Sequence, residues 1–168
     1  LVPEEALGAF IGEDPNGTWT LTISDDLAGD GGNLNGWSLG VTTLPNAPIT
    51  ATVPTQTQST PVTIPTGPGV VTSTIVVAGA GTAILDVNAT TFIQHSFSAD
   101  LDVTLTSPAG TVVTLTSDNG AGNDNVFNGT VWDDSANPAG QGPYPTNNGQ
   151  VTDHAYVNLT LASPFVPE

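Results

Sequence analysis

Aspartate is the residue type in this chain that is best placed to do chemistry. Of 168 residues, 16 are acidic, and there is no Lys, Arg, Cys or Met. Two carboxylates about 4 Å apart repel each other by about 4 kcal/mol at an effective dielectric near 20. Because no Lys or Arg relieves this repulsion, a group of aspartates must stay solvated, take up protons or bind a cation. The densest groups are Asp25/Asp26/Asp30, Asp100/Asp102, Asp118/Asp124 and Asp133/Asp134.

Calcium is the cation that these groups favour. Ca²⁺ takes about six to eight oxygen ligands, which loops rich in Asp, Asn and Gly supply. Asp100 and Asp102 are two apart in an alternating run, which predicts that they share one face of a strand. No segment has the EF-hand spacing, and residues 120–126 match only one copy of a repeat that needs stacking to bind calcium. The sequence therefore predicts Ca²⁺ at some of these nine aspartates, with solvated acidic turns as the alternative.

Catalytic residues are scarce. The absence of Cys excludes disulfides, thiol catalysis and cysteine-ligated structural zinc. There is no G-x-S-x-G motif, and the two histidines are His95, expected in the core or at its rim, and His154, expected on an exposed face. Glu13 and Asp14 are a carboxylate pair of the kind that hydrolyses glycosides, but adjacent acids in a turn sequence are more often caps or turn formers. We expect that the chain is not an enzyme.

The charge balance excludes two classes of partner. A net charge of −16 leaves no basic footprint for nucleic acid and no polybasic surface for anionic lipid. No apolar run approaches the length that spans a bilayer, so no membrane insertion is expected. Few charged and oxidisable residues, together with abundant Thr, Gly and Asn, indicate an extracellular or cell-surface location.

The hydrophobic pattern predicts an all-β fold, a jelly-roll-like β-sandwich. Residues 19–23 and 37–41 alternate apolar and polar side chains, as strands with one buried face do. Further strands are expected over residues 70–77, 92–97, 101–106, 111–116 and 151–161. Residues 107–110 (SPAG) read as the loop of a hairpin. Between these runs, residues 44–66 contain a Pro every few positions and no charge, which predicts an extended spacer or a strand lent to a neighbour.

Two sets of motifs resemble the P domain of proprotein convertases, also called the P/Homo B domain. Residues 10–21 (FIGEDPNGTWTL), 24–30 (SDDLAGD) and 34–39 (LNGWSL) resemble the C-terminal third of that domain. Residues 93–97 (IQHSF), 100–111 (DLDVTLTSPAGT) and 130–134 (TVWDD) resemble its N-terminal part. Ala99 departs from the usual Gly, a small change in a loop. The resemblance implies a non-catalytic β module, and calcium sites are common in its bacterial relatives.

The order of the two parts is inverted relative to the family. We expect residues 1–44 to be the C-terminal portion of a P-like domain, 45–61 a linker or donor segment, and 62–168 the N-terminal portion. The V-P-E at 166–168 repeats that at 2–4, so the chain is expected to be a window on a tandem array, or a subunit that exchanges strands with its neighbours. Either case predicts that Trp19 and Trp37 pack on another copy or stay exposed.

The resulting functional prediction is a calcium-stabilised structural module of an extracellular fibre, stalk or surface filament. Its partners would be copies of itself. The alternatives are an accessory P domain that stabilises the catalytic domain of a secreted hydrolase, and a module that binds glycans or cell surfaces. The glycan-binding alternative would use Trp132 or Tyr144.

Overall fold

The computed structural model describes residues 1, 3–44 and 51–134. Two short 3-10 helices, η1 (Leu7–Phe10) and η2 (Ser98–Asp100), accompany the strands. The strands are β1 (Gly17–Asp25), β2 (Gly32–Leu44), β3 (Ala51–Thr52), β4 (Gln56–Gln58), β5 (Val62–Ile64), β6 (Gly69–Val77), β7 (Ala83–His95), β8 (Leu101–Thr106), β9 (Val112–Thr116) and β10 (Asn128–Trp132). Neither described helix is long and apolar enough to cross a membrane.

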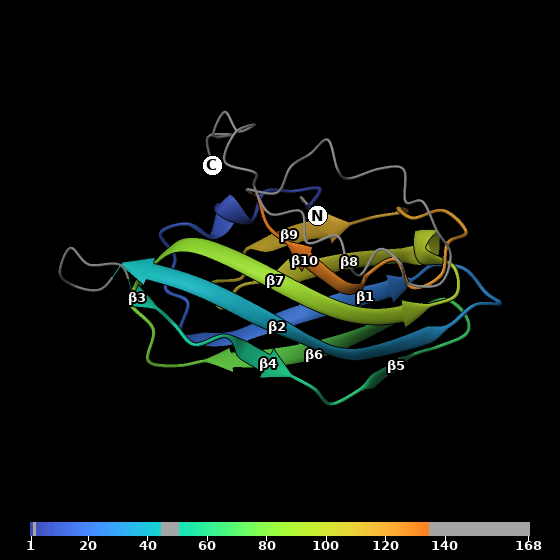
Figure 1. Ribbon diagram of the computed structural model, residues 1–168, viewed down its shortest axis with the longest axis horizontal. Helices are drawn as coiled ribbons and strands as arrows, with labels where there is room; N and C mark the ends of the chain where they lie inside the picture. Colours follow the sequence, from blue (N-terminus) through green and yellow to red (C-terminus); the bar gives the residue numbers. More distant parts are fainter. Residues whose placement is uncertain (2, 45–50, 135–168) are drawn as a thin grey trace.

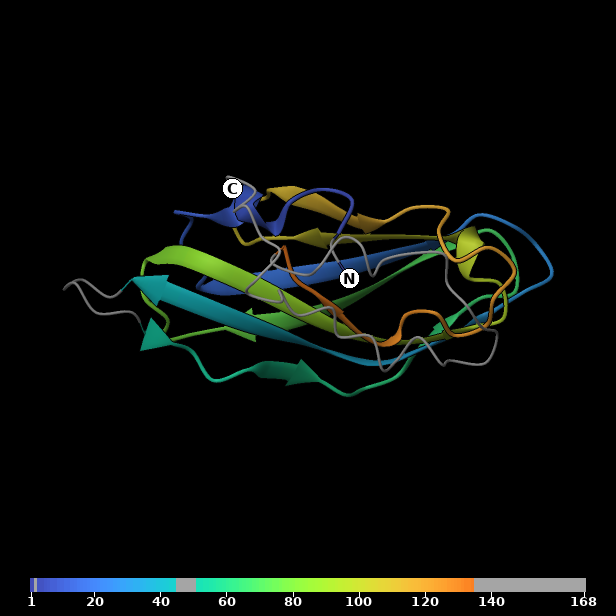
Figure 2. The ribbon, with the colours of Figure 1, turned by 45° about the horizontal axis from the view of Figure 1, so that its top comes forward.

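The strands form two antiparallel sheets that pack face to face, which confirms the predicted β-sandwich (Figure 1). One sheet has the order β6-β1-β8-β9, and the other has the order β10-β7-β2-β3. The rotated view in Figure 2 shows the two layers running side by side along the long axis of the molecule. Each layer buries one face against the other and leaves its second face outside.

The first 44 residues supply an internal strand to each sheet. β1 lies between β6 and β8, with Leu21 opposite Leu105 and Ile23 opposite Val103. β2 pairs with β7 along almost its whole length. The two segments expected to be separate portions of a domain therefore form one sandwich within a single chain.

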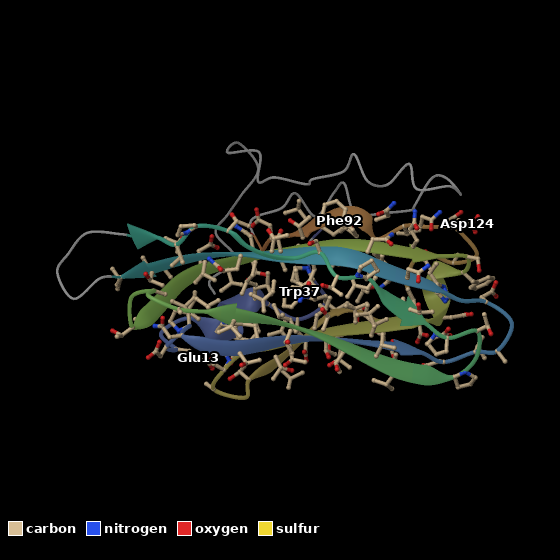
Figure 3. All side chains as sticks on the ribbon, turned by 90° about the horizontal axis from the view of Figure 1, so that it is seen from below. Glu13, Trp37, Phe92 and Asp124 are labelled. Carbon is tan, nitrogen blue, oxygen red and sulfur yellow. The ribbon has the colours of Figure 1, made fainter. Side chains whose placement is uncertain are left out.

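Both tryptophans of residues 1–44 are fully buried in that sandwich, so the expectation that they pack on another copy is wrong. Trp19 and Trp37 are each 0% exposed. Trp19 donates its indole N–H to the Pro15 carbonyl (2.9 Å) and meets the Phe10 ring edge-on at 5.1 Å. Trp37 points between the two sheets (Figure 3). Strands of the same chain therefore bury the apolar surface of both tryptophans, and no neighbouring copy is needed to do so.

The Pro-rich segment is extended, as predicted, but it is not a free spacer. Residues 45–50 lie outside the described part of the chain. Beyond them, β3, β4 and β5 each pair antiparallel with β2. Short strands of two or three residues between prolines fit this position, because Pro is tolerated at the edge of a sheet. The segment thus covers one edge of its own sheet rather than being lent to a neighbour.

Candidate metal centre

Three aspartates meet at the end of the sandwich where β1 ends and β8 begins. Asp26 follows β1, Asp102 lies on β8 opposite Ser24, and Asp118 follows β9. One carboxylate oxygen from each of the three lies within 4.8 Å of the others. The antiparallel pairing of β1 with β8 and of β8 with β9 brings these distant sequence positions together.

Local hydrogen bonds orient this group. The Ser24 hydroxyl donates to Asp26 Oδ1 at 2.9 Å. Asp118 has a φ of 52°, in the left-handed region that Asp tolerates better than most residues. In that conformation its backbone N–H donates a hydrogen bond to the Asp102 carboxylate. Asp102 Oδ1 is inaccessible to solvent and has no hydrogen-bond partner.

The group is electrostatically strained without a counter-ion. Burial raises the pKa of Asp102 above its ordinary value, and the negative charges of Asp26 and Asp118 raise it further. Glu4 adds a weaker effect in the same direction. Because the chain contains no Lys or Arg, it has no permanently cationic side chain that could neutralise these negative charges. A bound cation would relieve the repulsion and stabilise the charged carboxylates.

The donor set fits a hard divalent cation. Asp26, Asp102 and Asp118 offer only oxygen ligands, with two of the residues exposed and Asp102 partly buried. Calcium accepts carboxylates in one- or two-oxygen contacts and fills its remaining positions with water, whereas zinc prefers nitrogen and sulfur. Glu4 is held beside the group, since its carboxylate accepts from Ser117 N (2.7 Å) and Ser117 Oγ (2.6 Å).

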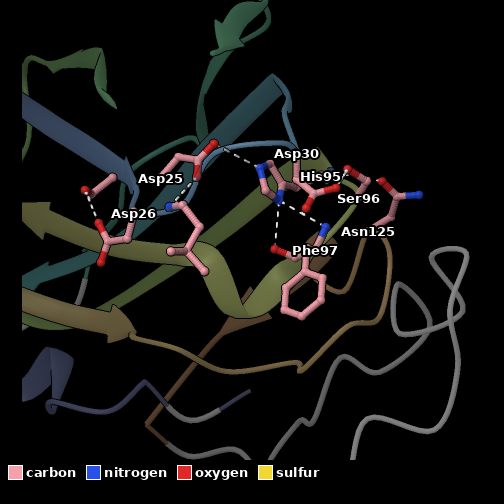
Figure 4. Close-up of polar contacts among 9 residues, drawn as sticks. Asp25, Asp26, Asp30, His95, Ser96, Phe97 and Asn125 are labelled. Atoms are coloured by element: carbon pink, nitrogen blue, oxygen red, sulfur yellow. Dashed lines mark hydrogen bonds and ion pairs between the residues drawn. The ribbon is translucent and has the colours of Figure 1, made fainter. Parts of the chain in front are cut away.

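Two other predicted metal ligands, Asp25 and Asp30, instead form contacts with His95 and with its neighbour Ser96 (Figure 4). Asp25 is 1% exposed, and its Oδ2 lies 3.3 Å from His95 Nε2. The other ring nitrogen of His95 contacts the backbone of Phe97, and Asp30 accepts the Ser96 hydroxyl at 2.8 Å. His95 is buried, as expected, and both of its ring nitrogens contact Asp25 or backbone atoms rather than a hydroxyl nucleophile.

Asp100 corrects one geometric prediction. It belongs to η2 rather than to β8 and is buried, so it does not share a strand face with Asp102. Burial raises its pKa, and the charges of Asp25 and Asp30 raise it further. The neighbouring residues Asp25 and Asp26 therefore belong to different groups. Asp25 lies with Asp100 in the buried interior at this end of the sandwich, and Asp26 lies with Asp102 on the outer face of the sheet.

The remaining candidates lie outside the three-aspartate group. Asp124 lines an open depression of about 350 Å³ together with His95 and Asn125. The Asp134 carboxylate accepts the N–H groups of Leu7 (3.0 Å) and Gly8 (2.7 Å), which is a structural role at η1. Asp133 and Asp134 also raise the pKa of Asp86, after the larger effect of burial.

Of the two residues proposed for glycan binding, only Trp132 lies in the described part of the chain, and it is not an exposed aromatic platform. Trp132 is 1% exposed and donates its indole N–H to Thr91 Oγ1 at 3.1 Å, so its ring is a core group. This corrects the expectation for Trp132. Tyr144 and His154 lie outside the described residues, as does the strand expected over 151–161.

Sequence reasoning missed Glu4 and Asp86, because only groups of neighbouring aspartates were considered: Glu4 is a glutamate, and Asp86 has no aspartate close to it in the sequence. Glu4 comes beside Asp102 only when residues 3–5 lie along β9, where the N–H of Glu4 donates to the Leu115 carbonyl. Asp86 is brought near Asp133 and Asp134 by the pairing of β7 with β10. Only the register of the strands could have revealed either relationship.

Comparison with known proteins agrees with the motifs. The family model described as the proprotein convertase P-domain matches residues 5–41 and 84–142, which is more than half of the chain. The matched segments contain η1, β1, most of β2, all of β7 except Ala83, and the strands β8 to β10. Searches of the curated proteins and of the solved structures find no match. On the strength of the family match, this chain belongs to the proprotein convertase P-domain family.

Proposed function

We propose that the chain is a structural module of an extracellular fibre, stalk or surface filament, stabilised by Ca²⁺ and without catalytic activity of its own. The observation that carries the proposal is the meeting of Asp26, Asp102 and Asp118 in a chain without Lys or Arg. A cation at this point would link the end of β1, the start of β8 and the loop after β9. It would thereby stiffen one end of the sandwich.

The repeated V-P-E supports an array of such modules. Val166 lies 164 positions after Val2, a spacing suited to one domain and its linker. Because residues 1–44 complete the sandwich of their own chain, whole domains in series account for the described fold better than strand exchange does. In a filament of this kind the calcium site would resist mechanical and thermal opening of each unit.

The calcium part of the proposal is tested by thermal unfolding. A ligand that binds only the folded state at about 100 times its Kd adds about 2.7 kcal/mol of stability. For a chain of this size we therefore expect Tm to be several degrees higher in excess Ca²⁺ than in EDTA. Matched ionic strength of Na⁺ should not reproduce the increase. Identical melting curves with and without EDTA would remove calcium from the proposal.

The assembly part is tested on the native polypeptide. Intact mass measurement and electron microscopy of the secreted material should show repeated domains of this kind in an extended array. A single copy joined to a protease domain would instead establish the accessory role.

A further inference from the structure

Residues 3–5, which we call the Glu4 segment, lie along the outer edge of β9. The N–H groups of Glu4 and Glu5 donate to carbonyls of β9, at 3.1 and 2.9 Å. Glu5 is held further, since its carboxylate accepts the Thr114 N–H at 2.6 Å. The segment therefore brings a fourth carboxylate, that of Glu4, to the end of β9 that precedes Asp118.

The Glu4 carboxylate binds the residues on both sides of Asp118. It accepts the Ser117 N–H at 2.7 Å and the Ser117 hydroxyl at 2.6 Å, and it also accepts the side-chain amide of Asn119. Asp118, between these two residues, has a φ of 52°, a conformation that is uncommon for any residue other than Gly. Glu4 thus holds the loop in the conformation in which the Asp118 N–H reaches the Asp102 carboxylate.

Glu4 lies beside the three-aspartate group without joining it. Both of its carboxylate oxygens already accept hydrogen bonds, and among the described residues the oxygens within 4.8 Å of one another are those of Asp26, Asp102 and Asp118. After burial and the charges of Asp26 and Asp118, the charge of Glu4 also raises the pKa of Asp102. Docking of Glu4 on β9 is therefore opposed by repulsion when the group holds no cation, and favoured by attraction when it does.

We propose that docking of the Glu4 segment on β9 and binding of Ca²⁺ at the three-aspartate group strengthen each other, with Glu4 as the positioning residue that couples them. This inference rests on the calcium site proposed above. The docked segment fixes the conformation of Asp118, and a bound cation removes the repulsion that opposes docking. Asp102 Oδ1, which is inaccessible to solvent and has no hydrogen-bond partner, is the oxygen left for the cation.

Such a coupling is reciprocal. The factor by which undocking of the segment weakens Ca²⁺ binding must equal the factor by which bound Ca²⁺ disfavours undocking. Coupling factors between sites in proteins are typically about 5-fold to 150-fold. The same factor can therefore be measured twice, once as a change in Kd and once as a change in the opening of the segment.

The coupling gives calcium a specific role in the array proposed above. Residues 2–4 read V-P-E, and these letters recur at 166–168, where the proposed array joins the next module. With Ca²⁺ bound, the segment at each junction would be held on β9 of its own module. Without Ca²⁺, the segment would leave that edge more often. Calcium would then set the stiffness of the junctions between modules, in addition to the thermal stability of each module.

Hydrogen exchange of two amides measures docking in the complete 168-residue chain. The amides of Glu4 and Glu5 exchange when the segment leaves β9, so saturating Ca²⁺ should slow their exchange by about tenfold or more relative to EDTA at matched ionic strength. The amide of Gly110 is the control, because it bonds to the Ser107 carbonyl in the loop at the opposite end of β9. Its exchange rate should be the same in both conditions.

Calcium titration of three variants by isothermal calorimetry separates positioning from charge. Asn119→Ala removes a donor to Glu4 without changing any charge, and it should raise the Kd for Ca²⁺ by about fivefold or more. Glu4→Gln should raise the Kd by about tenfold or more and abolish the effect of Ca²⁺ on exchange of the Glu5 amide. Glu5→Gln is the matched control, because the same change one position along affects a carboxylate that bonds to Thr114. It should change the Kd by about twofold or less.

These experiments separate failure of the coupling from failure of the calcium site. Absence of Ca²⁺ binding by the wild-type chain would overturn the site and the coupling together. Binding that Asp102→Asn weakens and Glu4→Gln leaves unchanged would keep the site and overturn the coupling. Equal effects of Glu4→Gln and Glu5→Gln would also overturn it, as would equal exchange of the Glu4 and Glu5 amides with and without Ca²⁺. If Glu4→Gln does not fold, amide exchange in the wild-type chain decides.

Discussion

Trp37 on β2 donates its indole N–H to the Ser73 hydroxyl on β6, 3.1 Å away across the interior between the two sheets. Trp37 is 0% exposed and Ser73 is 7% exposed. This contact joins a strand from the first 44 residues to a strand from the second part of the chain. The two parts of the chain are therefore joined by a buried hydrogen bond as well as by hydrophobic packing.

The first prediction follows from this contact. Ser73→Ala leaves the buried indole N–H of Trp37 without its acceptor, which should lower the free energy of unfolding by about 1–3 kcal/mol. Urea unfolding followed by tryptophan fluorescence measures the change. Thr72→Ala, on the exposed face of the same strand, should change stability by no more than about 0.5 kcal/mol. Equal effects at the two positions would show that the hydrogen bond does not matter.

Gly32 gives a second prediction. A Cβ built at Gly32 would lie 1.7 Å from the Gln94 carbonyl oxygen, so Ala cannot fit without moving β2 away from β7. Gly32→Ala should therefore destabilise the fold by several kcal/mol or prevent folding. Gly67→Ala is the control, because its Cβ would meet nothing within 4 Å. Circular dichroism during thermal unfolding compares the two variants, and similar Tm values would contradict this close approach of the strands.

Much of the fold was predictable because local alternation is a strong signal. The run over residues 101–106 coincides with β8, and the buried face of Trp19, Leu21 and Ile23 is as expected. β7 extends well before the predicted start at Phe92, because its first half contains Asp86 and Asn88, which interrupt the apolar pattern. The strands that pair with or pack on each predicted strand could not be predicted, because alternation shows which side chains are buried but not which strand is the partner.

The candidate site shows the same limit. Adjacent aspartates were grouped by sequence, but successive residues of a strand point to opposite faces. At the end of β1, Asp25 consequently meets His95, whereas Asp26 joins Asp102 and Asp118. Selecting three of nine candidates required the pairing of β1, β8 and β9, which the residue pattern does not specify.

The pH dependence of stability without calcium is the third prediction. Burial, first among the causes, raises the pKa values of Asp86, Asp100 and Asp102. A carboxyl with a raised pKa holds its proton more tightly in the folded chain, so its contribution to stability grows as pH falls through that pKa and is lost as pH rises through it. In EDTA, Tm should therefore rise as pH falls from neutral toward the ordinary range of aspartate pKa values.

At lower pH the trend should reverse. Hydrogen bonds, chiefly from backbone N–H groups, lower the pKa values of Glu5 and Asp14, so their contribution is lost only below the ordinary carboxyl range. Excess Ca²⁺ should reduce the gain in Tm on mild acidification, because calcium and protons compete for the same oxygens of Asp102. Calorimetric scans across this range measure both effects. A steady fall in Tm from pH 7 downward in EDTA would contradict the assignment of buried, repelling carboxylates.

The three-aspartate site is the central claim, and calcium titration by isothermal calorimetry tests it most directly. The wild-type chain should bind Ca²⁺ at this group, and Asp102→Asn should weaken that binding by about tenfold or more, because it removes a charged ligand. Asp30→Asn is the control, since Asp30 accepts the Ser96 hydroxyl and lies outside the group. The account predicts loss in Asp102→Asn and wild-type binding in Asp30→Asn. Absence of calcium binding by the wild-type chain, or equal weakening in both variants, would contradict it.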